Sequence, residues 1–383
     1  MLNFELYNPT RLIFGKGQIA RLAEFTPKTK ILLVYGGGSI FKNGIHDQVR
    51  AALEGYDITE FAGIEANPRF ETAMKAVALI KEHGIKFILA VGGGSVIDAV
   101  KFMSAAVNFE GDPIEILQKR MLIKENAMPF GTVLTIPATG SEMNSGAVIS
   151  IERTHEKLSF GGQALFPQFS ICDPTVISSL PKRQIQNGVV DAYTHVLEQY
   201  LTYKHDAFLQ DRIGEAILST LIEIGPSVVE NPGDYALQSN LMWCCTMALN
   251  GLLNKGVPTD WATHMIGHEL TALYGIDHAR TLAIIGPNLY RAMFDTKMEK
   301  LAQYGRRIFN LQGPDEEVAR NAIERTSAFL ESMGMELHIS RFSQDTDAPE
   351  IIEKRFADRG WLGIGEKQLV TPEKVREIVQ ASL

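Results

Sequence analysis

The sequence has few cysteines and no spacing that would pair them. Only three occur among its 383 residues, namely Cys172, Cys244 and Cys245, and two of them are neighbours. An odd number with this spacing makes neither a disulfide framework nor a CxxC metal knuckle. We therefore expect buried free thiols.

The sequence also has no excess of basic residues and no long apolar run. Lys and Arg number 37 against 45 Asp and Glu, and no basic stripe stands out that could bind a phosphate backbone. The N-terminus has no basic segment followed by an apolar stretch, and no uncharged apolar run approaches the length of a membrane span. These absences predict a cytoplasmic protein without a nucleic-acid or membrane partner.

Short apolar runs alternate with helical patterns from about residue 28 to 175. Three of the runs end in glycine and hydroxyl residues: KILLVYGGGS, KFILAVGGGS and GTVLTIPATGSE. The stretches between them, such as ETAMKAVALIKEHG, have helical periodicity. Strand, loop and helix repeated in this order predict an α/β domain with a mostly parallel, Rossmann-like sheet, which binds ligands at the carboxyl ends of its strands.

The pattern changes near residue 180, where SSLPKRQ supplies a proline and a shift to polar residues. Beyond it, β-branched runs become rare and amphipathic patterns such as QDRIGEAILSTLIEIGPSVV take over. We predict two domains, an α/β domain over residues 1–180 and an all-α domain over residues 181–383.

One glycine loop stands between an apolar run and a helical pattern, at Gly92, Gly93, Gly94 and Ser95. Glycines there let the backbone approach a ligand closely, and the N–H groups that open a helix favour an anion such as a pyrophosphate. The pattern is not GxGxxG, and a tight turn without a ligand would look the same at a single loop. Three such loops at successive strand ends favour a dinucleotide.

A second loop, Gly36 to Ser39, bears on the choice of dinucleotide. Many sites for NAD place an acidic residue near a strand end to hold the ribose 2′-hydroxyl. Here Gly37, Gly38 and Ser39 offer no carboxylate, which leaves room for a 2′-phosphate and a hydroxyl to bind it. This favours NADP(H), although a purely structural turn would have the same sequence.

Histidines are concentrated in the helical half. Asp191 and His195 are four residues apart, so one face of a helix presents both a carboxylate and an imidazole among apolar neighbours. A buried Asp needs a partner. Alone, this pair is more typical of a structural hydrogen bond than of half a metal site.

His264 and His268 form a second pair with the same spacing, and His278 follows after Gly275, where we expect the helix to end. A zinc protease of the HExxH type needs its glutamate directly after the first histidine, but Met265 stands there and Glu269 follows the second. The sequence therefore argues against that class.

Taken together, Asp191, His195 and two of the three later histidines would supply one oxygen and three nitrogen ligands. Such a set suits Zn(II) or Fe(II) and can leave a position open for a substrate. Each histidine singly could be a residue of the core, but one ion would supply a partner to all of them.

The ordered motifs of this chain resemble those of the iron-containing (group III) alcohol dehydrogenases. These motifs are PTRLIFGKG, YGGGSI, EANP, VGGGSVIDAVK, TIPATGSE, DAYTH and WATHMIGHELTALYGIDHA. The resemblance is strongest to the branch of NADPH-dependent butanol dehydrogenases and broad-range aldehyde reductases, and it weakens after about residue 310. It implies an α/β cofactor domain, a helical metal domain and a homodimer.

Carried over residue by residue, the resemblance implies a particular site. The metal ligands would be Asp191, His195, His264 and His278, with His268 beside the metal and Asp98 near the nicotinamide. The cofactor would contact Gly37, Gly38, Ser39, Asn67, Gly93, Gly94, Ser95, Thr135, Thr139 and Lys157. One departure is TIPATGSE, in which Pro137 stands where many relatives have another residue.

The expected function is that of a metal-dependent NADP(H) oxidoreductase that interconverts primary alcohols and aldehydes. The metal would act as a Lewis acid on the substrate oxygen, hydride would pass at C4 of the nicotinamide, and His268 could relay a proton. Trp243, Trp261 and Met265, which we expect near the ligands, would give the substrate site apolar walls.

Two other functions are also consistent with the sequence. One is an enzyme like glycerol dehydrogenase or dehydroquinate synthase, although few basic residues are available around 191–278 to bind a phosphorylated substrate. Another is a noncatalytic metal-binding protein.

Overall fold

The structure, a computed structural model, describes residues 1–383, and the chain forms two compact units. One unit, here called the sheet unit, comprises Tyr7–Ile185 and Asn231–Asn250. The other, called the helical unit, comprises Met1–Leu6, Gln186–Glu230 and Gly251–Leu383. Each unit thus gathers segments that are far apart in the sequence.

The sheet unit is built on a six-stranded parallel sheet with the strand order β1-β8-β5-β4-β2-β3. The strands are β1 (Arg11–Phe14), β2 (Ile31–Tyr35), β3 (Ile58–Phe61), β4 (Phe87–Gly92), β5 (Phe130–Leu134) and β8 (Phe169–Cys172). Every residue of the four inner strands is buried, as expected when helices cover both faces of a parallel sheet. The predicted α/β fold is confirmed.

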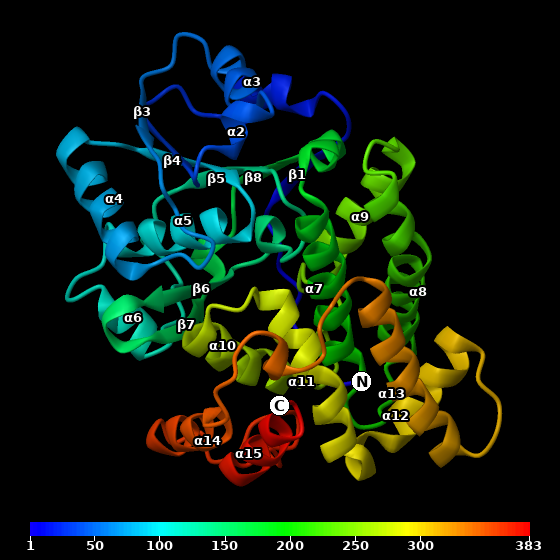
Figure 1. Cartoon of the computed structure of the whole chain (residues 1–383). Coiled ribbons are helices and arrows are strands. Elements are labelled where there is room, and N and C mark those ends of the chain that lie inside the picture. The colour runs from blue at the N-terminus through cyan, green and yellow to red at the C-terminus, as the bar shows by residue number, and fades with distance from the viewer. The chain divides into compact units, whose positions relative to one another are not determined.

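Helices cover the two faces of this sheet (Figure 1). The helices of the unit are α1 (Leu22–Phe25), α2 (Ser39–Lys42), α3 (Ile45–Ala52), α4 (Phe70–His83), α5 (Gly94–Ala106), α6 (Ile114–Gln118) and α9 (Tyr235–Ala248). Helix α5 packs against β2, β4 and β5. An antiparallel pair, β6 (Gly146–Ile151) with β7 (Glu156–Gly161), completes the unit.

Helix α9 comes from the half of the sequence predicted to be helical, yet it belongs to the sheet unit. It packs against the 3-10 turn Pro174–Ser179 and against the segment Ser141–Met143. Its Trp243 packs edge-to-face on Phe14 of β1, with ring centroids 5.9 Å apart. Trp243 therefore lies in the sheet unit and not in the unit that holds the histidines.

The predicted helical fold class of the C-terminal part is confirmed, and the helical unit is built from helices. Its helices are α7 (Lys182–Tyr200, from Gln186 onward), α8 (Phe208–Glu230), α10 (Ala262–Tyr274), α11 (His278–Ala292), α12 (Phe294–Phe309), α13 (Asp315–Ser332), α14 (Ala348–Asp358) and α15 (Pro372–Gln380). Helix α10 ends as predicted, because Gly275 adopts the left-handed conformation at its C-cap with φ 67°. No helix of the chain is both long and apolar enough to cross a membrane.

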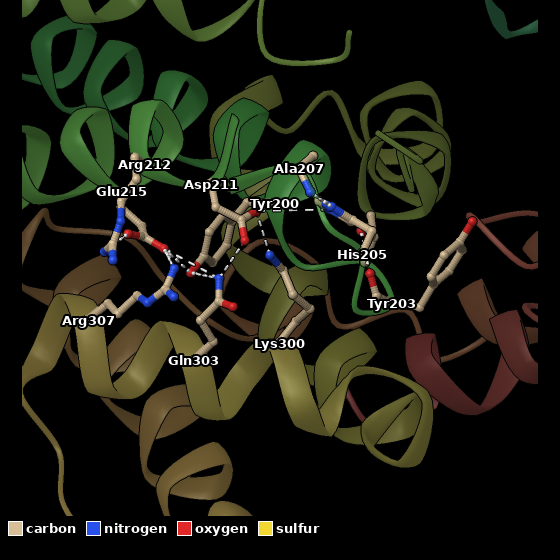
Figure 2. A network of polar contacts seen from close by, with 11 residues as sticks. Tyr200, Tyr203, His205, Ala207, Asp211, Arg212, Glu215, Lys300, Gln303 and Arg307 are labelled. Carbon is tan, nitrogen blue, oxygen red and sulfur yellow. Dashed lines mark hydrogen bonds and ion pairs between the residues drawn. The ribbon is translucent and has the colours of Figure 1, made fainter. Parts of the chain in front are cut away.

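A buried polar network joins α7, α8 and α12 inside the helical unit (Figure 2). Lys300 is 1% exposed, donates to Asp211 over 2.7 Å and lies over the ring of Tyr200, 4.2 Å from its centroid. Glu215 accepts from the Tyr200 hydroxyl over 2.9 Å and from Arg307 over 2.6 Å. Each buried charge in this network has an opposite charge beside it, as burial requires.

Candidate active site

In the sheet unit, the predicted dinucleotide loops gather at one edge of the sheet. The strand order reverses between β2 and β4, because β3 adds on one side of β2 and β4 returns to the other. The ends of these strands are level, with Tyr35 beside Val91 and Gly92 beside Leu134. Crevices at such a reversal, outside the carboxyl ends of the strands, are where open α/β sheets bind their ligands.

The loop after β4 requires its glycines for close packing. A Cβ on Gly93 would lie 2.9 Å from Cβ of Ile136, and one on Gly94 would lie 2.5 Å from the side chain of Thr139. Gly94 opens α5, whose first N–H groups have no acceptor within the helix. The loop from β5 therefore sits directly against the amino end of a thirteen-residue helix that can bind an anion.

Asp98 is held by the segment that follows β5. Its two carboxylate oxygens accept hydrogen bonds from the Ser141 hydroxyl over 2.7 Å and from the backbone N–H of Val148 over 2.9 Å. Lys101, one turn further along α5, donates to Ser141 over 2.7 Å and to Asn144 over 2.9 Å. Burial raises the pKa of Asp98 and lowers that of Lys101 to about 8.

Other predicted cofactor residues lie near the same edge. Lys157 donates to the Asn67 side chain over 3.1 Å, and the Ser95 hydroxyl donates to the carbonyl of Ala66. Gly37 has open space where a side chain would be, because no atom lies within 4 Å of an added Cβ. Ser39 opens α2 directly after Gly38, which adopts φ 95°.

In the helical unit, three helices bring the predicted metal ligands together. Asp191 and His195 lie one turn apart on α7, His264 lies on α10, and His278 opens α11. Oδ1 of Asp191 is 3.6 Å from Nε2 of His195, 4.0 Å from Nε2 of His264 and 3.6 Å from Nε2 of His278. One oxygen therefore faces three imidazole nitrogens.

This cluster has the chemistry of a cation site. Oδ1 of Asp191 is buried and no hydrogen-bond donor reaches it. Burial lowers the pKa of His195 to about 4, although the charge of Asp191 opposes that shift, so its imidazole is neutral as a metal ligand must be. A single divalent ion would serve one carboxylate and three imidazoles, a ligand set that suits Fe(II) or Zn(II).

His268 lies beside this cluster, against the rings of two of the proposed ligands. It is half-buried on α10, and its ring centroid is 5.1 Å from that of His278 and 6.3 Å from that of His264. The structure thus brings all five predicted residues of the metal region together in one unit.

Glu198 is a residue of this site that the sequence analysis missed. It is 2% exposed on α7, and its carboxylate accepts from the ring Nδ1 of His264 and from two backbone N–H groups at the start of α10. Burial, together with the charge of Asp260, raises the pKa of Glu198 to about 8. Its place one turn after His195 was the available signal, since Asp191, His195 and Glu198 share one helical face.

The comparisons with known proteins agree with this geometry. Residues 9–174 match the family model for iron-containing alcohol dehydrogenases, and residues 185–383 match the model for the C-terminal part of the same family. The chain belongs to the iron-containing alcohol dehydrogenase family. The resemblance noted in the sequence is therefore confirmed.

Within this family, the chain is similar along its whole length to the NADPH-dependent aldehyde reductase YqhD of Escherichia coli, with 48% identity over 100% of both chains. It is 42% identical to a probable NADH-dependent butanol dehydrogenase of Bacillus subtilis, again over 100% of both chains. A crystal structure of the E. coli protein superposes with a TM-score of 0.98 at 47% identity, covering 100% of this chain and 99% of the other.

The NADH-dependent butanol dehydrogenase A of Thermotoga maritima superposes with a TM-score of 0.95 at 34% identity, covering 100% of this chain and 99% of the other. These relatives belong to the predicted branch of aldehyde reductases and butanol dehydrogenases. Their names also divide between NADPH and NADH, so membership of the branch does not by itself decide the cofactor.

Proposed function

We propose that the protein is a metal-dependent NADP(H) oxidoreductase that interconverts primary alcohols and aldehydes. The observation that carries this proposal is the single carboxylate oxygen of Asp191, which faces three imidazole nitrogens within 4.0 Å. Because the chain belongs to this family and all four proposed ligands are present, a catalytic role is better supported than that of a noncatalytic metal-binding protein. The relatives favour aldehydes and alcohols over the substrates of a glycerol dehydrogenase or a dehydroquinate synthase.

We assign Asp191, His195, His264 and His278 as the residues that hold the cation. When bound, Fe(II) or Zn(II) would supply Lewis-acid polarisation of the substrate oxygen. The protein fixes the ligands before binding, since Asp191 and His195 are less than 5% exposed on one helix and His264 is buried on another. The ligand positions therefore need little rearrangement.

We assign the edge of the sheet at β2, β4 and β5 to NADP(H), which when bound would exchange hydride with the substrate carbon at C4 of its nicotinamide. The N–H groups that open α5 at Gly94 and Ser95 would hold the pyrophosphate. Gly37, Gly38 and Ser39 would leave room for the 2′-phosphate, and Lys157, held by Asn67, would add a positive charge. Thr135 and Thr139 would also contact the cofactor.

Two residues are candidates for roles in the chemical step. His268 would move a proton to or from the substrate oxygen, because its ring lies 5.1 Å from that of His278 and remains half-buried. Asp98 would act near the nicotinamide, where its hydrogen bonds from Ser141 and Val148 fix the direction of its carboxylate.

We further propose a homodimer that works in the cytoplasm. The apolar side chains of Met1, Leu2, Phe4 and Leu6 are each more than half exposed, and the sheet ends in the edge strand β1. Apolar surface and open strand edges favour association with another chain. All three cysteines are free and buried, as in proteins of a reducing compartment.

The test is the oxidation of NADPH and NADH by butanal, before and after removal of metal with a chelator and after addition of Fe(II) or Zn(II). We expect activity that prefers NADPH, disappears with the chelator and returns with one metal. If metal binds but no aldehyde supports oxidation of either cofactor, the proposed chemistry is wrong.

A further inference from the structure

We propose that Glu198 is a positioning residue that fixes both the orientation and the tautomer of His264 for metal binding. The inference rests on the proposed metal site and assigns a role within it that none of the four ligands can perform. It is carried by the contacts of one carboxylate, which joins α7 to the beginning of α10.

The first function of Glu198 is to cap α10. Its Oε1 accepts from the backbone N–H of Thr263 over 2.7 Å and from that of His264 over 3.3 Å. The first N–H groups of a helix have no partner within it, and a carboxylate there also interacts favourably with the helix dipole. Because Glu198 lies on the helix that carries Asp191 and His195, this cap sets where α10 begins relative to those two ligands.

The second function concerns the His264 ring. Oε2 of Glu198 contacts Nδ1 of His264, while Nε2 of the same ring is the atom that lies 4.0 Å from Asp191. In its ionised form Glu198 can only accept a hydrogen bond, so Nδ1 carries the proton and Nε2 keeps its lone pair for a metal. Ligand histidines in metal sites commonly depend on such a second hydrogen bond.

His195, on the same helix as Glu198, lacks this arrangement. Nδ1 of His195 is buried without a hydrogen-bond partner. Its ring is stacked on that of His264, with centroids 4.7 Å apart and planes at 19°. A rotation of the His264 ring would therefore disturb His195 as well, so one carboxylate stabilises two of the four ligands.

Replacement of Glu198 by glutamine distinguishes the hydrogen bonding of the carboxylate from the space that the side chain fills. Both carboxylate oxygens accept hydrogen bonds, but a glutamine side chain of the same shape has a single acceptor. If its oxygen caps α10, its NH₂ group faces Nδ1 and selects the tautomer that protonates Nε2. If the amide is reversed, the cap is lost.

The matched control is Glu215→Gln. Glu215 is also a buried carboxylate of the helical unit whose two oxygens accept hydrogen bonds, here from Tyr200, Arg212 and Arg307 (Figure 2). It contacts none of the proposed ligands, so its replacement tests the effect of losing a buried charge in general.

The experiment is a titration of metal-free wild type, Glu198→Gln and Glu215→Gln with Zn(II) in a calorimeter, and with Co(II) by absorption spectroscopy. We expect about a 10- to 100-fold weaker affinity for Zn(II) and an altered Co(II) spectrum in Glu198→Gln. Glu215→Gln should match the wild type in both. Equal affinity and spectra in all three proteins would overturn the inference, whereas failure of the wild type to bind either metal would overturn the proposed function.

A measurement on the wild type covers the case in which Glu198→Gln does not fold. The protein labelled with ¹⁵N in its histidine rings and free of metal reports by NMR which ring nitrogen of each histidine carries the proton. The His264 signals are assigned by their loss in His264→Gln. We expect the proton on Nδ1, and a proton on Nε2 would overturn the inference.

Discussion

The indole ring of Trp261 lies edge-on to the imidazole of His264, with ring centroids 5.4 Å apart and planes at 71°. Trp261 adopts φ 64° at the N-cap of α10, a left-handed conformation that is rare for a bulky side chain. The neighbouring residue Asp260 fixes this conformation through two hydrogen bonds. The backbone N–H of Asp260 donates to the Glu198 carbonyl over 2.9 Å, and the Asp260 carboxylate accepts from the backbone N–H of Ala262 over 2.8 Å. Strained residues of this kind are concentrated at functional sites.

Replacement of Trp261 by alanine should therefore weaken substrate binding. The half-buried indole is the large apolar surface beside two ligand imidazoles, and its loss should raise KM for butanal by about 10-fold or more. Steady-state kinetics with aldehydes of increasing length would measure the effect. Trp243→Ala is the control, because Trp243 is 43% exposed and packs on Phe14 in the sheet unit. Equal changes in KM in the two variants would refute a role for Trp261 as a wall.

The buried Lys297 should be important for stability. It is 1% exposed and pairs with Asp260 and Glu366. Replacing it by methionine leaves two carboxylates buried without their cation, so we expect the free energy of unfolding to fall by about 3–5 kcal/mol. Urea denaturation would measure this. The exposed pair of Lys354 with Asp358 supplies the comparison, since Lys354→Met should lower stability by less than about 1 kcal/mol.

Lys101 should make stability depend on pH in the alkaline range. Burial lowers its pKa from 10.5 to about 8 in the folded protein. Between these values the unfolded chain binds more protons at this site than the folded chain, so the contribution of Lys101 to stability rises with pH. The free energy of unfolding of the wild type relative to Lys101→Met should increase by up to about 3 kcal/mol across this interval. A difference independent of pH would contradict the lowered pKa.

Gly37 should determine the choice between the two dinucleotides. A side chain fits there, because no atom lies within 4 Å of an added Cβ and the backbone is not left-handed, unlike that of Gly38 with φ 95°. A carboxylate in Gly37→Asp would repel a 2′-phosphate, so we expect kcat/KM for NADPH to fall about 10- to 100-fold with little change for NADH. Gly37→Asn is the uncharged control. An equal loss with both cofactors would instead indicate that the loop has been distorted.

The sequence was informative wherever a pattern is local. The strands ending in Tyr35, Gly92 and Leu134 have apolar runs bounded by glycine or polar residues, and the end of α10 at Gly275 follows from one glycine. The pairing of Asp191 with His195 was also visible because both lie on one helical face.

Contacts between distant residues were not accessible in this way. Glu198 contacts His264, which lies 66 positions later in the chain, and no local pattern around either residue predicts this contact. The attachment of α9 to the sheet unit depends on packing against Pro174–Ser179, far earlier in the chain. The left-handed backbone of Trp261 opposes the intrinsic preference of tryptophan, and the hydrogen bonds of Asp260 that impose it come from the folded structure.

The central claim is that Asp191, His195, His264 and His278 hold one cation on which aldehyde reduction depends. The most direct measurement is a titration of the metal-free protein with Zn(II) or Fe(II), in which bound metal and NADPH-dependent reduction of butanal are determined on the same samples. We expect one ion per chain, with activity that rises in proportion to occupancy and is absent from Asp191→Ala. Full activity in the metal-free protein, or in Asp191→Ala, would contradict the claim.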